Sequence, residues 1–459
     1  DHMRSATFMI GDKIMPSNEG RGYVLRRLIR RAARHGKKLG IEGLFLTEII
    51  GKVIDVTGEA YPELEEQRDF ISKIVQKEEE KFSETLNQGL HLLEKAFENI
   101  NQGKQDGILP GEIAFKLHDT YGLPYEITEE ICHERGFNVD LEGFKTFMAQ
   151  QKQAGQKDAA ASDHAWKKNA DNLEVQGETL FTGYENHIDT GNVLGLYVDG
   201  ESGKTAGQGA VCDIVLDRTP FYAAGGGQSA DKGQLHATGF QCDVLDVTKQ
   251  QGVIVHRVQI QSGEVHVSDS LECLVDVPNR NATARNHTGT HILHKALRLV
   301  LGDHVQQAGS SVNGDGLRFD FSHFEAMNKD QIDQVEQIIN NQIKVFLPVL
   351  TQEMSMADAT NAGAIGLFED KYGDLVRVVS VGEFSKELCG GIHVMNSGQI
   401  GALHIVSESG VAAGVRRIEA VTGNGVLKLL SIKENIVIRA AEILTTNPDV
   451  ILDRLTTQS

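Results

Sequence analysis

The stretch His-Thr-Gly-Thr-His at residues 287–291 lies in a segment, 279–301, whose apolar residues recur at the spacing of a helix. Residues four apart on a helix share one face, so His287 and His291 are expected to direct two imidazoles at the same point. By itself this pair is a weak signal, because two histidines at helical spacing are often ordinary surface or core residues.

A second stretch, Cys-Gly-Gly-Ile-His at 389–393, strengthens the signal. Cys389 and His393 are four apart around two glycines, which favours a tight loop over a helix. Three imidazoles and one thiolate suit a tetrahedral zinc ion, so the two stretches together predict one zinc per chain. The alternative is a histidine-bearing helix packed on an unrelated glycine turn. A metalloprotease is excluded, because Thr288 stands where that motif needs a glutamate as general base.

The composition bounds the class of protein. A chain of 459 residues that is 40% hydrophobic and 24% charged is typical of a soluble globular protein of two to four domains. The net charge of −19 argues against a generally basic nucleic-acid binder, so any nucleic-acid surface must be a local patch. Five scattered cysteines indicate a reducing compartment rather than a disulfide framework. No apolar run approaches the ~20 residues of a membrane span.

The densest basic run lies at residues 20–38, which are predicted to form an amphipathic helix. Apolar residues keep helical spacing on one side, and Arg27 and Arg31 belong to the arginine-rich other side. One interpretation is that this face contacts the phosphates of a nucleic acid. The other is a solvated face, or a face paired with an acidic partner, and the run alone does not separate them.

The rest of the chain predicts a mixed architecture. A long helix is expected at 68–99, a break at 118–124 with Asp119 at the end of a helix, and a polar helix fading into a linker at 142–170. From Thr179, short β-rich runs separated by Gly and Asp turns suggest a small antiparallel barrel. These runs are expected at 193–198, 211–216, 253–260 and 271–277.

Further elements follow the barrel. A glycine-rich stretch, Ala-Ala-Gly-Gly-Gly-Gln at 223–228, lies inside the barrel region and is read either as a close approach to a ligand or as a flexible hairpin tip. Later helices and antiparallel strands predict an α+β fold. That region holds expected strands at 317–321, 375–381, 402–407 and 415–421 and a helix at 328–345.

Five motifs together resemble alanyl-tRNA synthetase of bacterial type. They are Met-Pro-Ser-Asn-Glu-Gly-Arg-Gly-Tyr-Val-Leu-Arg-Arg at 15–27, His-Asp-Thr-Tyr-Gly at 118–122, the two metal-ligand pairs, and Gly-Val-Arg-Arg-Ile-Glu-Ala-Val-Thr-Gly at 414–423. They occur in family order, and the resemblance covers almost the whole chain. The resemblance implies that the aminoacylation core and the oligomerisation domain of the family lie outside this chain.

The resemblance also implies a domain plan for a multidomain α+β protein. A helical tRNA-recognition domain is expected at 1–155, a small antiparallel β-barrel at 156–270, a zinc-binding α+β editing core at 271–424, and the start of a C-terminal helical domain at 425–459.

The activity that the resemblance implies is hydrolytic editing of mischarged Ser-tRNA(Ala) and Gly-tRNA(Ala), in a cytoplasmic protein that attaches alanine to tRNA(Ala) with ATP when complete. One small group discriminates by only about 1–3 kcal/mol, so an alanine site needs a second, hydrolytic site. One alternative is a tRNA-binding module with a structural zinc. The other is a free-standing deacylase, which would lack the arginine-faced helix and the Asp119 turn.

The resemblance assigns roles to Thr290 and Gln307, which match editing positions of the family; helix packing and a polar turn are their alternatives. If His287, His291, Cys389 and His393 all bind the zinc, its shell is closed and is typical of a structural site. Catalysis would then need a fifth coordination position, or a zinc that only orients the substrate while a nearby water attacks. The sequence leaves that choice open.

The resemblance also assigns tRNA contacts. Asn18 and Asp119 match positions that read a G·U wobble pair of the acceptor stem, although a helix cap and a turn are their structural alternatives. Arg416 is expected to contact the acceptor end. Three positions depart from the family pattern and put fine substrate preference in doubt: Gly289, Ala308 and Ile392.

Overall fold

The computed structural model describes residues 1–459 except 19, 101–106, 161–176, 367–373, 413 and 459. The chain divides into two compact units. The N-terminal unit holds residues 1–167 with 412–415, and the C-terminal unit holds residues 168–411 with 416–459. Among the described residues, no helix is both long enough and apolar enough to cross a membrane.

In its described residues the N-terminal unit is helical, with one two-residue parallel pair of strands. Its elements are α1 (His2–Gly11), α2 (Gly20–Lys38), α3 (Leu46–Thr57), α4 (Pro62–Glu66), α5 (Arg68–Asn99), β1 (Ile108–Leu109), α6 (Gly111–Asp119), α7 (Tyr125–Glu134), β2 (Asn138–Val139) and α8 (Leu141–Ala160). The predicted helices at 20–38 and 68–99 are confirmed, and α6 ends at Asp119 as expected. The predicted fading of α8 into a linker falls largely outside the described residues.

Helices α2 and α5 pack through their apolar faces. Leu25 and Ile29 of α2, together with Ile71 and Phe82 of α5, are completely buried. Arg30 of α2 is also buried, with its guanidinium 5.2 Å from the Phe82 ring centroid and an ion pair to Glu78. The arginine-rich side of α2 is therefore not uniformly exposed.

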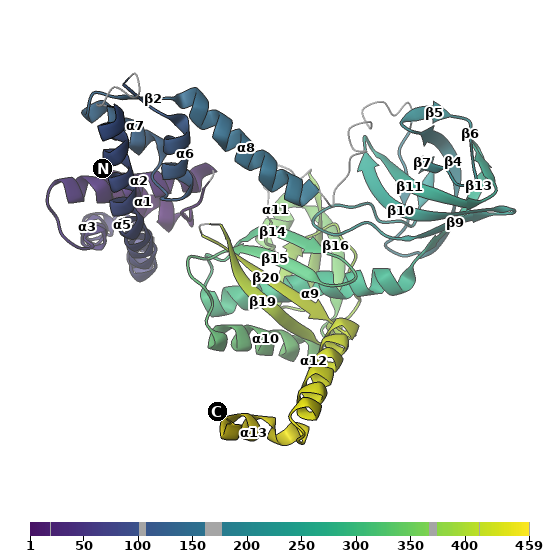
Figure 1. The fold of residues 1–459 in the computed structure, drawn as a ribbon. Helices are drawn as coiled ribbons and strands as arrows, with labels where there is room; N and C mark the ends of the chain where they lie inside the picture. Colours follow the sequence, from purple (N-terminus) through teal and green to yellow (C-terminus); the bar gives the residue numbers. More distant parts are fainter. Residues whose placement is uncertain (19, 101–106, 161–176, 367–373, 413, 459) are drawn as a thin grey trace. The chain divides into compact units, whose positions relative to one another are not determined.

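A closed six-stranded antiparallel barrel begins the C-terminal unit (Figure 1). Its ring runs through β4 (Ile188–Val198), β7 (Val211–Leu216), β11 (Val253–Ser262), β10 (Phe240–Gln250), β9 (Gly233–Ala237) and β13 (Ser270–Val275), and β13 pairs back with β4. Shorter strands complete this part: β3 (Leu180–Phe181), β5 (Glu201–Gly203), β6 (Thr205–Gly207), β8 (Arg218–Thr219) and β12 (Glu264–His266).

The barrel confirms the predicted β-rich runs and adds β9 and β10, which the sequence analysis did not predict. The closing strand β13 ends at Val275, so the barrel extends past the expected boundary at 270. The expected strand at 271–277 was wrong at its end, because Val277 is already the first residue of the next helix, where the Asp276 side chain accepts a bond from the Asn279 amide.

The remaining part of the C-terminal unit is α+β. The helices are α9 (Val277–Leu301), α10 (Lys329–Lys344), α11 (Met356–Asn361), α12 (Asn424–Ile443) and α13 (Ile451–Gln458). One sheet has the order β14 (Gln307–Val312), β15 (Leu317–Ser322), β20 (Val415–Thr422), β19 (Leu403–Ala412). The other has the order β16 (Val349–Ser355), β17 (Leu375–Val381), β18 (Ser385–Leu388).

Helix α9 organises this part. It packs beside α10 and against β14 and β15 (Figure 1), and its apolar residues join one core cluster with those of the four-stranded sheet. Ile292, Leu293 and Leu297 are completely buried in that cluster. Because the core fixes the rotation of α9 about its axis, it also fixes the direction in which the histidines of the helix point.

Candidate metal centre and adjoining pocket

The four predicted metal ligands lie together. One ligand atom from each of His287, His291, Cys389 and His393 can be chosen so that all four lie within 4.8 Å of one another. The imidazole rings of His287 and His291 on α9 are nearly parallel, and their centroids are 5.4 Å apart. The Cys389 Sγ atom lies 3.4 Å from His287 Nε2 and 3.3 Å from His393 Nε2. The structure thus joins two pairs of residues that are remote in the chain.

The chemistry of these donors fits a metal ion. His291 is buried, and its Nδ1 atom lies 2.6 Å from the Glu387 carboxylate. A carboxylate only accepts hydrogen bonds, so Nδ1 carries a proton and Nε2 is the atom that a metal would bind. Among the described residues, that Nε2 atom is buried and has no hydrogen-bond partner. A buried imidazole nitrogen of this kind beside a thiol and two further imidazoles is the donor set that zinc prefers.

The electrostatics of the cluster favour the ionised thiol. Burial opposes a thiolate, but the imidazoles of His287, His393 and His291 outweigh burial and hold the pKa of Cys389 well below its usual range. Burial lowers the pKa of His393 to about 3, so this ring is neutral. Burial also opposes a charged His291, yet Glu387 and Cys389 raise the pKa of His291 to about 10. A thiolate and neutral imidazoles are the ligand forms that a metal needs, and a bound metal would displace the His291 proton.

The glycine loop that carries Cys389 requires one of its two glycines. A Cβ atom added at Gly391 would overlap the His287 ring, whereas one added at Gly390 would meet no atom within 4 Å. Only Gly391 is therefore needed for the loop to approach α9 closely.

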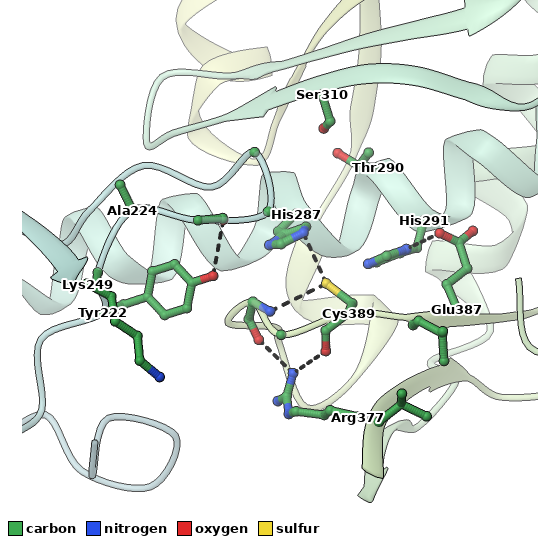
Figure 2. Close-up of a pocket in the computed structure, with 18 of the residues that line it drawn as sticks. Tyr222, Ala224, Lys249, His287, Thr290, His291, Ser310, Arg377, Glu387 and Cys389 are labelled. Atoms are coloured by element: carbon green, nitrogen blue, oxygen red, sulfur yellow. Dashed lines mark hydrogen bonds and ion pairs between the residues drawn. The ribbon is translucent and has the colours of Figure 1, made fainter. Parts of the chain in front are cut away.

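A pocket of about 800 Å³ opens beside the cluster. Both predicted editing residues, Thr290 and Gln307, line this pocket. His287, His291 and Cys389 line it too, and Figure 2 shows them beside Thr290. The Thr290 hydroxyl lies 2.9 Å from the Asn286 carbonyl oxygen and donates to it. Its oxygen lone pairs consequently remain available to accept a hydrogen bond from a bound molecule.

Several lining residues were missed by the sequence analysis. They include Tyr222, Lys249, Ser310, Arg377 and Glu387 (Figure 2). Arg377 donates from one nitrogen to the carbonyl oxygens of Cys389 and Gly391, at 2.8 Å each, and so fixes the loop from behind. Of these residues, only Glu387 could have been suspected from the sequence, because it lies two positions before the predicted metal ligand Cys389.

The N-terminal unit has its own cavity, of about 700 Å³, and it brings the two predicted base readers together. Asn18 and Asp119 both line it. The Asn18 side-chain oxygen accepts from Arg26, and a carboxylate oxygen of Asp119 accepts from Gln151 of α8. A guanidinium only donates, so the Asn18 atom facing Arg26 must be the oxygen, which leaves the amide NH₂ available to donate.

The other predicted tRNA contacts are paired within the protein. Arg27 lies 2.8 Å from Glu126, and Arg31 lies 3.4 Å from Glu130, both on α7. Arg416 makes two bonds to Glu408, at 2.5 and 2.7 Å. The paired face on α2 agrees with the alternative of an acidic partner, which lies in the same chain. Contacts of these arginines to phosphate remain predictions.

Comparisons with known proteins cover nearly the whole chain. A family model described as tRNA synthetases class II (A) matches residues 1–279. A second, described as threonyl and alanyl tRNA synthetase second additional domain, matches residues 376–419 and so includes Cys389 and His393.

Full-length relatives agree with the family models. An alanine–tRNA ligase of Alkaliphilus oremlandii is 45% identical over 458 residues, which are 99% of this chain and 52% of that protein. An alanine–tRNA ligase of Halorhodospira halophila is 45% identical over 449 residues, 98% of this chain and 51% of that protein. The chain therefore spans about half the length of the curated relatives that it matches.

Proposed function

Because this chain belongs to the alanyl-tRNA synthetase family, we propose that its C-terminal unit hydrolyses the ester of mischarged Ser-tRNA(Ala) and Gly-tRNA(Ala). The observation that carries the proposal is the pocket whose wall combines the His/Cys cluster with Thr290 and Gln307. Its volume of about 800 Å³ lies within the range of small-molecule sites. The complete protein would in addition attach alanine to tRNA(Ala) with ATP, in the cytoplasm.

The cluster would hold one zinc ion. A bound zinc would polarise the ester carbonyl or orient the aminoacyl group. Its four protein ligands would be His287, His291, Cys389 and His393. Since four ligands close a tetrahedral shell, orientation of the substrate is the role that this donor set favours.

Discrimination would fall to Thr290. Its hydroxyl proton is already donated to Asn286, so its lone pairs would accept the hydroxyl proton of a seryl group. An alanyl methyl makes no such bond, which disfavours alanine relative to serine. A glycyl group makes no such bond either, so its preference over alanine would require that the alanyl methyl lacks space at the same position. Gln307, whose amide both donates and accepts, would orient the attacking water.

The N-terminal unit would select the tRNA. Asn18 and Asp119 share one cavity, and the Asn18 amide NH₂ is available to donate. A wobble pair displaces the edges of its bases, so one amide donor and one carboxylate acceptor suit the atoms that it exposes. Arg27 and Arg31 would add contacts to the phosphate backbone, and Arg416 of the C-terminal unit would contact the acceptor end.

The test is release of serine from purified Ser-tRNA(Ala) by wild type, Cys389→Ala and Thr290→Val, with Ala-tRNA(Ala) run in parallel. We expect wild type to release serine much faster than alanine and Cys389→Ala to lose the activity. Thr290→Val should change the ratio of the serine and alanine rates more than the serine rate itself. No release above buffer, or a fully active Cys389→Ala, would overturn the proposal and favour a tRNA-binding module with a structural zinc.

A further inference from the structure

Gln228 ends the glycine-rich stretch of the barrel and is buried, with 3% of its surface exposed. The turn before it is closed by two backbone bonds between Gly225 and Gln228, at 3.0 and 3.1 Å. Two further backbone bonds join this segment to Val312 of β14, one from the Val312 amide to Gly227 and one from the Ser229 amide to Val312. The backbone of the turn is thus held on both sides, and the Gln228 side chain reaches the metal cluster.

The Gln228 side-chain oxygen meets both halves of the cluster. It accepts from the Ile392 amide at 2.9 Å and lies 2.7 Å from His287 Nδ1. A backbone amide only donates, so the atom that it faces must be the oxygen and not the nitrogen of Gln228. His287 Nδ1 shares that oxygen and must therefore carry the ring proton. His287 Nε2 is left with the lone pair, and it is the atom 3.4 Å from Cys389 Sγ.

The other histidines of the cluster are also held from behind by oxygen atoms. Glu387 accepts from His291 Nδ1, and the Thr288 hydroxyl lies 3.2 Å from His393 Nδ1. Glu387 and Thr288 belong to the α+β part, whereas Gln228 is supplied by the barrel. Partners of this kind fix the ring orientation and the tautomer of a metal-binding histidine.

We propose that Gln228 is a positioning residue of the metal centre. Its oxygen holds His287 in the Nδ1–H tautomer and fixes the Ile392 amide, so that the barrel completes a site whose ligands all lie outside the barrel. The inference rests on the proposed zinc site but not on the proposed hydrolysis. Gly225 and Gly227 of the same turn line the pocket, so the contact also ties one wall of the pocket to the metal ligands.

The surroundings of the Gln228 amide nitrogen argue that the glutamine does more than fill space. It is buried and has no hydrogen-bond partner among the described residues. An unsatisfied buried donor is destabilising, and an apolar side chain of the same length would avoid that cost. The two bonds accepted by the oxygen are what the glutamine adds over such a side chain.

The experiment compares Gln228→Met, which keeps the length but removes the acceptor, with Gln228→Glu, which keeps an acceptor oxygen. Gln259→Met, at an exposed position of β11, is the matched control for the substitution itself. Zinc affinity is measured on the whole chain by competition with a chromogenic chelator, and the cobalt(II) absorption spectrum reports the ligand geometry. Thermal melting with excess chelator shows whether each metal-free variant still folds.

We expect Gln228→Met to bind zinc about 10–100-fold more weakly and to change the cobalt spectrum. Gln228→Glu and Gln259→Met should stay close to wild type. Equal affinities of wild type and Gln228→Met, or equal losses in Gln228→Met and Gln228→Glu, would overturn the inference. A wild type that binds no zinc would overturn it together with the metal site. A wild type that binds zinc without deacylating Ser-tRNA(Ala) would overturn only the proposed hydrolysis.

Discussion

Arg27 of α2 lies 2.8 Å from Glu126 of α7, and the Tyr23 hydroxyl donates to the same carboxylate at 2.7 Å. The pairing repeats farther along the two helices, where Arg34 lies 2.9 Å from Glu134. Arg27 and Glu126 are 36% and 42% exposed, and exposed pairs of this kind contribute at most about 1 kcal/mol. Phosphate groups of a nucleic acid can therefore compete with these carboxylates for the arginine face.

Replacing Arg27 and Arg31 by alanine should reduce the salt dependence of tRNA binding. Each phosphate contact that is lost lowers the slope of log K against log salt by about one. Glu126→Gln should increase the salt dependence of tRNA binding, because it removes a carboxylate that competes with phosphate for Arg27. Filter binding across a salt series measures both effects. Unchanged slopes in the double variant would mean that these arginines serve only the pairing with α7.

Asn18→Ala and Asp119→Ala should weaken the preference for an acceptor stem with a wobble pair. The expected loss of discrimination is about 1–3 kcal/mol for each base contact removed. Binding to matched stems that differ only at that base pair gives the measurement. Equal losses on the wobble and Watson–Crick stems would contradict base reading and leave a role in backbone contact or local structure.

Gly391→Ala should abolish zinc binding, because the added Cβ overlaps the ring of the ligand His287. Gly390→Ala is the matched control, since the same methyl group one position earlier meets no atom within 4 Å. Elemental analysis should find about one zinc per chain in wild type and in Gly390→Ala, as the four-ligand site implies. A full complement of zinc in Gly391→Ala, or in Cys389→Ala, would contradict the assigned site.

The barrel should lose stability in mild acid because of His256. Burial lowers the pKa of this histidine to about 4 from its usual value of 6.5, while Thr219 and the Ile214 carbonyl hold the neutral ring. Protons therefore bind the unfolded chain more readily, and stability is retained above pH 6.5 and falls as the pH drops toward 4. The loss by pH 5 should be on the order of 2 kcal/mol.

Urea unfolding of wild type and His256→Gln at pH 7 and pH 5 tests this dependence. The variant has no group that titrates at this position, so its stability should change less between the two pH values. Parallel curves for the two proteins would show that His256 is not responsible for the loss.

Helices were predicted well where their signal is local. The predicted helix at 20–38 coincides with α2 because apolar residues on one helical face are a property of the segment itself. Strands β9 and β10 were missed. They are strands because they pair with each other and with β11 and β13, and such pairing depends on distant segments more than on intrinsic preference.

The sequence by itself determined the donor types and the spacing within each pair of metal ligands, because residues four apart are brought together by a helical turn or a short loop. Only the tertiary structure decided which residues hydrogen-bond to the Nδ1 atoms of the histidine ligands. Gln228 and His287 are 59 residues apart in the chain, and His291 and Glu387 are 96 apart. No local spacing predicts such contacts, because they form only when the barrel, α9 and β18 pack around one point and the tautomer of each buried imidazole is set by the oxygen that reaches it.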